Sequence, residues 1–256
     1  MSLFKGLEQQ QLQKVAPLPV RMRPTSLEEF VGQDHFLGPG KLLRRMLEAD
    51  RLSSAIFYGP PGTGKTTLGQ IIANRTKAEF YQVHAAGAGV NQIRRILEHA
   101  RVVLANSGRR SVLFVDELHR FNRAQQDVLL SDVEDGIIIL IGATTQNPFF
   151  VVNSPLVSRS QIFQFHPLTN QQIKTLLLRS LKDRQRGLGQ YDVHITDQAL
   201  EHLAVASDGD ARRALTALEV GVMSQVRSAG RDDVKVHFDL EVAQESIQQK
   251  AVQYDA

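Results

Sequence analysis

The sequence of 256 residues contains no cysteine. Disulfides and thiolate metal sites are therefore excluded, which fits a reducing cytosol. Long hydrophobic runs are missing as well, since the longest aliphatic run, Ile137–Ile141, is far too short to cross a bilayer. The polar, Gln-rich stretch Met1–Gln13 does not resemble a secretory signal. We therefore expect a cytoplasmic protein with no membrane partner.

A strong excess of charge of either sign is also lacking. The formal net charge is +3 and the pI is about 9.3, values that permit contact with a polyanion but do not identify one. Local basic clusters could meet DNA phosphates, although most such clusters are solvated helix faces. These clusters are Arg44-Arg45, Arg94-Arg95, Arg109-Arg110 and the trio Lys182, Arg184, Arg186.

A glycine-rich stretch is the strongest signal present. It follows a short apolar run, Ala55–Tyr58, that predicts a buried strand, and it precedes helical spacing from Leu68 onward. The stretch fits G-x-x-x-x-G-K-[ST], a loop whose backbone N–H groups surround phosphate oxygens. We expect Lys65 to reach the β- and γ-phosphates of a nucleoside triphosphate, and the Thr66 hydroxyl to take one Mg²⁺ position. The predicted contacts in this loop are Gly59, Pro60, Pro61, Gly62, Thr63, Gly64, Lys65, Thr66 and Thr67.

A second apolar run, Val112–Val115, delivers two carboxylates at its end, Asp116 and Glu117. In P-loop folds this end of the strand lies beside the phosphate loop. Asp116 is therefore expected to hold Mg²⁺ through water, and Glu117 to polarise the water that attacks the γ-phosphate. A kinase needs a site for an acceptor hydroxyl, whereas a hydrolase needs a base that activates water. The pair consequently indicates hydrolysis.

A later strand, which ends near Ile141, is followed by polar groups. A strand of this kind lies between the P-loop strand and the Asp-Glu strand in one subgroup of these folds, where a hydroxyl or amide senses the γ-phosphate. Thr144, Thr145 and Asn147 are all candidates for that role. The eight histidines show no metal-ligand spacing. Two of them border the predicted site, where packing or support is favoured over ligation; they are His84 and His119.

Two arginines complete the candidate chemistry. Arg159, in a Ser-Arg-Ser segment, is a candidate finger that would reach the γ-phosphate of a neighbouring subunit. Arg212 lies in the first turn of a predicted helix that Asp208 or Asp210 could cap. A cation is electrostatically disfavoured at that end of a helix. Arg212 is therefore better explained as a residue that contacts phosphate than as one that only faces solvent.

Strands alternate with helices in the first part of the chain, and the strands are mostly apolar on both faces. This pattern predicts the α/β class, with a parallel sheet covered by helices on both sides. From Thr169 onward the pattern is helical. We predict an α/β nucleotide-binding domain over residues 1–166, of which 1–17 form a flexible leader, and a small all-helical domain over residues 167–256.

Together these motifs resemble the AAA+ ATPases, with a Walker A P-loop, a Walker B Asp-Glu strand, a sensor-1 strand end, a Ser-Arg finger and a Gly-Asp-x-Arg sensor-2 helix in a lid. Additional segments are similar to the RarA/MgsA family, which includes the Werner-helicase-interacting ATPases and is related to clamp-loader subunits and RuvB-type motors. Those segments are Arg21–Pro24, Val31–His35, Leu37–Gly40, Phe114–Asn122, Ala124–Asp127 and Ile141–Pro148.

The resemblance implies ATP and Mg²⁺ as cofactors, adenine contact near Val31 and Gly32, and nucleotide contact by Arg212. It also implies DNA-dependent ATP hydrolysis at stalled replication forks, on single-stranded DNA or junctions, in a nucleoid-associated protein. Expected partners are further copies of the chain and single-strand-binding or other replication proteins. Family members continue into a helical domain that assembles a homotetramer, so we interpret the chain as a fragment without it. That truncation bears on whether Arg159 can act in trans.

Two other interpretations remain open at this point. One is a nucleotide-gated adaptor whose ATP state controls partner binding with negligible turnover, and the other is a clamp-loader-like assembly factor. Glu117, Arg159 and Arg212 argue against the adaptor, because a pure switch could lack any of them.

Overall fold

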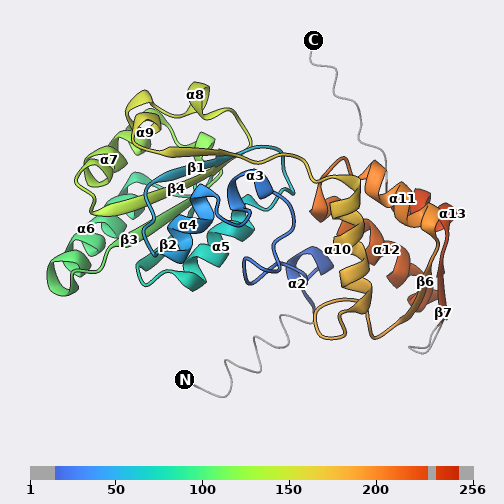
Figure 1. Ribbon diagram of the computed structural model, residues 1–256. Coiled ribbons are helices and arrows are strands. Elements are labelled where there is room, and N and C mark those ends of the chain that lie inside the picture. The colour runs from blue at the N-terminus through green and yellow to red at the C-terminus, as the bar shows by residue number, and fades with distance from the viewer. Residues whose placement is uncertain (1–14, 230–234, 248–256) are drawn as a thin grey trace, which may run out of the picture. The chain divides into compact units, whose positions relative to one another are not determined.

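The computed structural model describes residues 15–229 and 235–247, and these form two compact units (Figure 1). One unit is Pro24–His166; the other combines the described residues of Met1–Arg23 and Pro167–Ala256. The flexible leader predicted for residues 1–17 lies almost wholly outside the described residues. None of the described helices combines the length and the apolar character that a membrane span requires.

The α/β unit holds a five-stranded parallel sheet in the order β2-β3-β4-β1-β5. Strand β4 lies between β1, which precedes the P-loop, and β3, which ends at Asp116, and this confirms the position predicted for that strand. The elements are α3 (Asp34–Leu37), α4 (Leu42–Glu48), β1 (Ala55–Tyr58), α5 (Lys65–Arg75), β2 (Glu79–His84), α6 (Val90–Ser107), β3 (Ser111–Asp116), the short 3-10 helix η1 (Leu118–Arg120), α7 (Arg123–Glu134), β4 (Ile138–Thr144), α8 (Pro148–Val151), α9 (Ser154–Ser158) and β5 (Gln161–Gln164).

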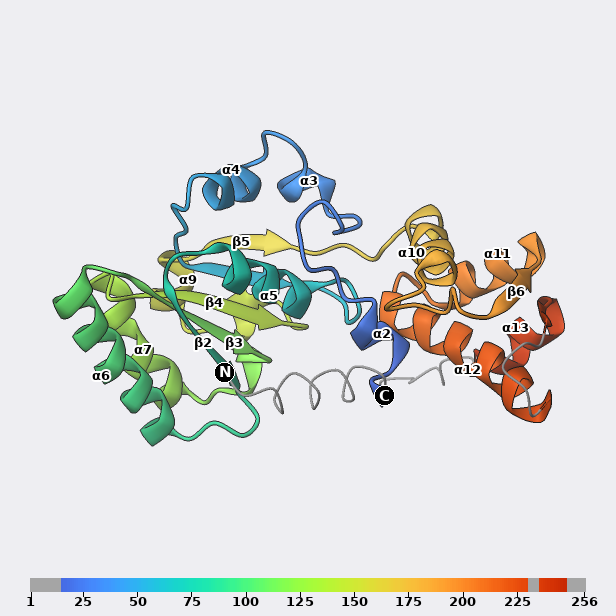
Figure 2. The same cartoon turned by 90° about the horizontal axis from the view of Figure 1, so that it is seen from below.

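Helices cover both faces of this sheet. Successive side chains of a strand point to opposite sides, so each strand contributes to a core on either face. On β3, Val112 and Phe114 join a core with residues of α3, α4 and α5, whereas Leu113 and Val115 join a second core with residues of α6 and α7. Figure 2 shows α4 and α6 on opposite sides of the strands. The three inner strands β3, β4 and β1 are buried on both faces, as a sheet covered on both sides requires, whereas the outer strands β2 and β5 also carry exposed polar residues.

The register of the sheet brings the ends of three strands together. Tyr58 of β1 pairs with Thr144 of β4, and Val115 of β3 pairs with Gly142 of β4. The segments that follow β1, β3 and β4 therefore leave the sheet at one carboxyl edge. Gly142 allows the close approach of η1 there, since a Cβ at this position would come 2.4 Å from Leu118 Cδ2.

The second unit contains α2 (Leu18–Arg21), α10 (Asn170–Lys182), α11 (Asp197–Ala206), α12 (Ala211–Ala229) and α13 (Leu240–Ser246). One correction applies, because the unit is not all-helical. Strands β6 (Asp192–Ile195) and β7 (Lys235–Phe238) pair in parallel. Both alternate polar and apolar residues, and Val236 and Phe238 point into the helical core.

The described segment before Pro24 belongs to this second unit, although the sequence analysis assigned it to the nucleotide-binding domain. Leu18 and Met22 are buried in the helical core. Arg21 pairs with Glu219 on α12 at 2.8 Å, and Glu219 also accepts a hydrogen bond from the backbone N–H of Leu18. Arg21 further donates to the backbone oxygens of Arg186 and Gly187. The segment is thus held by two buried apolar side chains and by the pair of Arg21 with Glu219.

Candidate active site

The loop between β1 and α5 has the curled backbone that a phosphate cradle requires. Gly59, Gly62 and Gly64 all have positive φ, a conformation that side-chain-bearing residues rarely adopt. At Gly59 a Cβ would also come 2.2 Å from the backbone oxygen of Phe165. Helix α5 begins directly after the loop, so its free N–H groups point toward the position of a bound phosphate.

Lys65 lies folded against this loop. Its side chain is buried, and its Nζ donates hydrogen bonds to the backbone oxygens of Gly59 at 2.7 Å and Pro60 at 2.6 Å. Thr63 is buried too and donates to the Pro60 oxygen at 2.8 Å. A phosphate is a stronger acceptor for an ammonium than a neutral carbonyl is. The loop therefore holds the cation next to the place where phosphate oxygens would replace these carbonyls.

Thr66 and Asp116 meet across the interface between α5 and β3. The Thr66 hydroxyl donates to Asp116 Oδ2 over 3.0 Å, and the carboxylate of Asp116 is largely buried. A hydroxyl and a carboxylate side by side are the hard oxygen donors that Mg²⁺ prefers, so the two residues fit the predicted metal position. No group of three or more potential ligands of the His, Cys, Asp or Glu types occurs within the described residues. This arrangement suits a Mg²⁺ that takes its other ligands from phosphate and water.

Glu117 adopts an unusual backbone conformation. Its φ is 59°, in the left-handed region, and its backbone N–H donates to Asp116 Oδ1 over 3.2 Å. The turn directs the Glu117 side chain away from the course of β3, so that 45% of it is exposed. Non-glycine residues in this region are held there by their surroundings, and they occur often at active sites. The carboxylate of Asp116 is thus largely buried, whereas that of Glu117 is accessible to solvent.

His119, on η1, connects Glu117 to β4. Its Nε2 lies 3.2 Å from Glu117 Oε2, and its Nδ1 lies 3.0 Å from Thr144 Oγ1. The His119 side chain is 8% exposed and Thr144 is fully buried. From the sequence, His119 was expected at the border of the site, in packing or support, but not in contact with both Glu117 and Thr144. The sequence shows that His119 follows Asp116 by three residues. It contains no feature that predicts the turn at Glu117, which directs the His119 ring inward.

The three sensor candidates differ in their surroundings. Thr144 is committed to His119 and also accepts the backbone N–H of Gln146 over 3.1 Å. Thr145, the next residue, is exposed at the end of the strand. Asn147 is exposed as well, but its Oδ1 caps α8 by accepting the N–H of Phe149. Thr144 therefore offers a buried hydroxyl, Thr145 an exposed hydroxyl and Asn147 an amide that caps a helix.

The segment with Val31 and Gly32 lies close to the P-loop. The ring of Phe30 packs so near Gly64 that a Cβ there would come 2.6 Å from Phe30 Cζ. Gln33, buried and in the left-handed region, exchanges two hydrogen bonds with the backbone of His166, at 2.8 and 2.9 Å. The sequence analysis did not identify this anchoring role of Gln33. It fixes the segment against the chain that leaves β5.

Arg159 follows α9 and is held by contacts within the α/β unit. Its Nη2 lies 2.6 Å from Glu134 Oε1, and its Nη1 donates to Pro155 O and Ser158 Oγ. The side chain is 41% exposed. A half-exposed guanidinium held by a half-exposed carboxylate can exchange that partner for another anion, because such ion pairs are weak.

Arg212 is exposed in the first turn of α12, within the second unit. It lines a cavity of about 270 Å³ together with residues of the same unit. The other lining residues are Asp210, Arg213, Thr216, Ala217, Ser246 and Ile247. Of the two acidic residues considered as caps, Asp210 accepts the backbone N–H of Arg213 over 3.1 Å.

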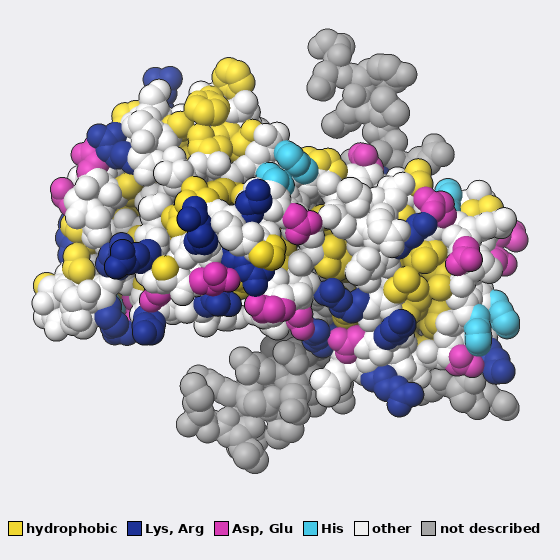
Figure 3. Space-filling model, viewed as in Figure 1, with side chains coloured by type: hydrophobic (Ala, Val, Ile, Leu, Met, Phe, Trp, Pro, Cys, Tyr) yellow, Lys and Arg dark blue, Asp and Glu magenta, His cyan; other side chains and the backbone are white. Residues whose placement is uncertain are grey.

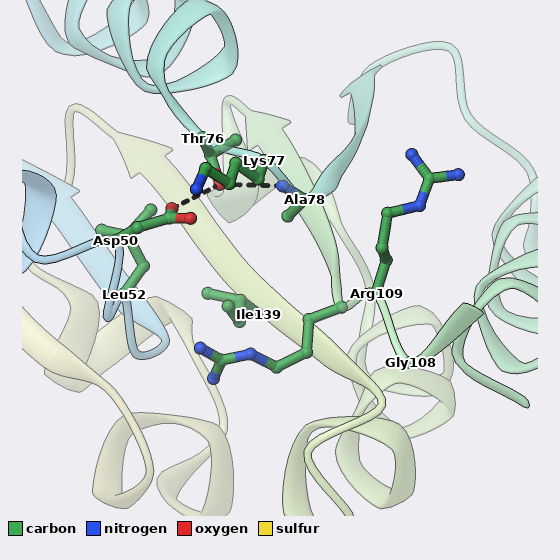
Figure 4. A pocket seen from close by; sticks show the side chains of 9 residues that line it. Asp50, Leu52, Thr76, Lys77, Ala78, Gly108, Arg109 and Ile139 are labelled. Carbon is green, nitrogen blue, oxygen red and sulfur yellow. Dashed lines mark hydrogen bonds between the residues drawn. The ribbon is translucent and has the colours of Figure 1, made fainter.

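A second cavity, of about 190 Å³, lies at the opposite, amino edge of the sheet (Figure 4). It is lined by Lys77, Arg109 and Arg110 and by parts of the segments that precede β1, β2 and β3. These three cations are exposed, in contrast to Lys65. On the face drawn in Figure 3, Lys and Arg side chains are interspersed with Asp and Glu rather than gathered in one stripe. Among the basic clusters, Arg44 is paired with Glu48 and Arg186 with Asp183.

Comparisons with known proteins agree with this geometry. The family model of the Holliday junction DNA helicase RuvB P-loop domain matches residues 22–153, and that of an AAA C-terminal domain matches residues 189–256. Replication-associated recombination protein A of Bacillus subtilis is 44% identical over 239 residues, which cover 93% of this chain and 55% of that protein. The ATPase WRNIP1 of Dictyostelium discoideum is 41% identical over 207 residues, or 81% of this chain and 23% of that protein.

Among solved structures, the RuvB Holliday junction branch migration motor of Thermotoga maritima superposes with a TM-score of 0.67 and 27% identity. The match covers 88% of this chain and 72% of that one. The chain spans about half the length of the bacterial recombination protein that it matches. The matched P-loop domain, the strand order of the sheet and the similar proteins all indicate the same family. The chain belongs to the AAA+ P-loop ATPases, in the family of the replication-associated recombination proteins A and WRNIP1.

Proposed function

We propose that this chain binds ATP with Mg²⁺ and hydrolyses it as part of a protein that acts on DNA at stalled replication forks or recombination intermediates. The observation that carries the proposal is the 3.0 Å contact between Thr66 and Asp116, which joins the P-loop to the Asp-Glu strand. Buried Lys65 beside the loop supports it further. The matched relatives are named for replication-associated recombination, which supports DNA as the partner.

In the proposed reaction, water attacks the γ-phosphorus of ATP, the bond from that phosphorus to the bridging oxygen breaks so that ADP leaves, and Glu117 accepts a proton from the water. Lys65 and the N–H groups of the loop stabilise charge on the phosphate oxygens, and Thr66 and Asp116 would hold Mg²⁺, which would neutralise developing charge. Thr145, exposed at the end of β4, is our choice for the γ-phosphate sensor, with Asn147 as the second candidate. Val31 and Gly32 would contact adenine.

Two arginines extend the proposal beyond the α/β unit. Arg212 would contact the nucleotide from the helical lid, and Arg159 would leave Glu134 to reach the γ-phosphate bound by a neighbouring copy. We therefore propose a homo-oligomer as the active form. A cytoplasmic, nucleoid-associated location and single-strand-binding or other replication proteins as partners follow from the same assignment.

The test is steady-state ATP hydrolysis by this chain, with and without single-stranded and forked DNA, over a range of protein concentrations. We expect turnover to rise with DNA and with protein concentration. Loss of a general base lowers rates by about 100-fold or more, so Glu117→Gln should lower kcat by that factor while ATP still binds.

A Glu117→Gln chain that hydrolysed ATP at the parent rate would remove Glu117 from its role. Tight ATP binding without turnover under every condition would leave two interpretations, a nucleotide-gated adaptor or a chain that does not assemble on its own, and the same assay on a longer chain would separate them. The same assay on Arg159→Ala, mixed in equal amounts with Glu117→Gln, tests action in trans. Each variant would then supply what the other lacks, and recovered turnover would support the neighbour's arginine.

A further inference from the structure

The link from Glu117 through His119 to Thr144 has a definite hydrogen-bond direction. An ionised carboxylate can only accept, so at 3.2 Å the His119 Nε2 must carry the proton and donate it to Glu117 Oε2. In a neutral imidazole the other nitrogen is then an acceptor. Nδ1 of a neutral ring then accepts the hydroxyl proton of Thr144, 3.0 Å away. The Gln146 backbone oxygen is a more distant acceptor for that proton, at 3.4 Å. The Thr144 oxygen keeps its lone pairs for the backbone N–H of Gln146, which donates to it over 3.1 Å.

Each hydrogen bond in this chain of contacts has one donor and one acceptor when His119 is neutral and protonated on Nε2. Burial makes that assignment matter, because a buried polar atom without a hydrogen bond is costly. Thr144 is fully buried and the His119 side chain is 8% exposed. Reversing the tautomer would leave a lone pair of Nε2 facing the carboxylate of Glu117. The surroundings therefore select one tautomer and one ring orientation.

We propose that His119 is a positioning residue for the hydrolytic step: its Nε2–H holds the carboxylate of Glu117, and Thr144 fixes the ring. This inference rests on the proposed role of Glu117 as base. With Oε2 committed to His119, Oε1 is the oxygen that accepts the proton of the attacking water. A freely rotating, 45% exposed side chain would present either oxygen in many orientations, most of them unproductive.

The same contacts connect the base to the end of β4. Thr144 and Gln146 flank Thr145, the proposed γ-phosphate sensor, and both take part in the hydrogen bonds at the Thr144 hydroxyl. A shift of this turn when Thr145 meets phosphate would move Thr144, and with it His119 and Glu117.

Three substitutions of His119 separate its two contacts. The amide nitrogen of His119→Gln reaches the position of Nε2 and can still donate to Glu117. The shorter amide of His119→Asn reaches only the position of Nδ1, beside Thr144. His119→Ala removes both contacts. Loss of orientation at a reacting group costs about ten-fold to a hundred-fold in rate. We expect kcat to fall by that range for Asn and Ala and by about three-fold or less for Gln.

The Michaelis constant for ATP should change by no more than about three-fold in all three variants, because His119 acts on the base and not on nucleotide binding. Thr144→Val removes the hydroxyl at nearly constant shape and should lower kcat less than His119→Ala does. The matched control is His99→Gln, since His99 is exposed on α6 and should leave kcat unchanged. Thermal unfolding of each variant separates loss of fold from loss of position.

A spectroscopic arm is independent of turnover. In the nucleotide-free chain, the side-chain ¹⁵N shifts of the eight histidines are measured, and the His119 pair is assigned by its absence in His119→Gln. We expect the shifts of a neutral ring protonated on Nε2, and we expect Thr144→Val or Glu117→Ala to replace them with averaged values. Shifts of the opposite tautomer, or shifts unchanged in both variants, would overturn the proposal.

The kinetic arm distinguishes failure of this inference from failure of the proposed function. If Glu117→Gln abolishes turnover while His119→Asn and His119→Ala retain the parent kcat, the base stands and the positioning role of His119 is wrong. If Glu117→Gln keeps the parent rate, the proposed function of Glu117 is wrong and this inference falls with it. A selective loss of kcat in Asn and Ala, restored in Gln, supports the proposal.

Discussion

The two edges of the five-stranded sheet are both polar, but their side chains are held in different ways. At the carboxyl edge, Lys65, His119 and Thr144 are buried and hydrogen-bonded between neighbouring elements. At the amino edge, Lys77 and Arg109 are exposed around a cavity of about 190 Å³ (Figure 4). Arg109 has an ion-pair partner there in Glu79, at 3.8 Å.

The difference shows what each edge can recognise. Buried groups with fixed partners keep their positions, and this preorganisation is what stabilises a particular arrangement of phosphate oxygens. Exposed arginines and lysines attract any nearby anion through a screened field, without a defined geometry. We therefore propose that the nucleotide binds at the carboxyl edge, although the amino edge is also basic and has a cavity.

The largest expected effect comes from one lysine at each edge. Lys65→Ala should weaken ATP binding by about 100-fold, because charge-assisted hydrogen bonds to phosphate contribute about 1.5–3 kcal/mol each. Lys77→Ala, its control at the amino edge, should change ATP affinity by less than about two-fold. Titration of each protein with a fluorescent ATP analogue measures both. Equal losses in the two variants would contradict the assignment of the nucleotide to the carboxyl edge.

The next effect concerns stability and compares one glycine from each edge. Gly59 and Gly108 both have positive φ, so alanine is strained at either position. At Gly59 the added Cβ also meets the Phe165 oxygen at 2.2 Å, whereas at Gly108 nothing lies within 4 Å. We expect Gly59→Ala to cost about 3 kcal/mol or more, and Gly108→Ala about 1 kcal/mol.

Urea unfolding followed by circular dichroism measures this pair. Similar midpoints for the two variants would mean that the loop at Gly59 can move away from β5. The P-loop would then be less rigid than the buried contacts of Lys65 indicate. The comparison of the two edges would be weakened accordingly.

The sequence predicted the site best where function depends on neighbours in the chain. The P-loop and the Asp-Glu pair are short motifs at strand ends, and a parallel sheet brings such ends to one edge. The position of β4 was expected from a subgroup of P-loop folds, in which a strand that ends in polar groups lies between the P-loop strand and the Asp-Glu strand. The prediction that the second domain is all-helical was wrong, because β6 and β7 pair there. These strands were hard to predict, since each has only four residues and they lie about 40 positions apart in the sequence.

The sequence could not predict contacts that depend on a single backbone turn. His119 points to Thr144 because Glu117 adopts a left-handed conformation, which its residue type does not favour. Choosing between Thr144 and Thr145 depends on which face of β4 each one occupies, and a shift of one residue reverses that choice. Gln33 anchors His166, 133 positions away, through its amide alone.

The smallest expected effect compares two buried hydroxyls at opposite edges. Thr144 Oγ1 bonds to His119 and Gln146, whereas the buried Ser111 Oγ, at the start of β3, has no hydrogen-bond partner among the described residues. Thr144→Val would leave two polar groups unpaired and should cost about 1–2 kcal/mol. Ser111→Ala removes a hydroxyl that gains nothing from burial, so stability should change by less than about 0.5 kcal/mol. Urea midpoints of the two proteins test this directly, and equal losses would show that the Thr144 hydroxyl contributes no more than an unpartnered one.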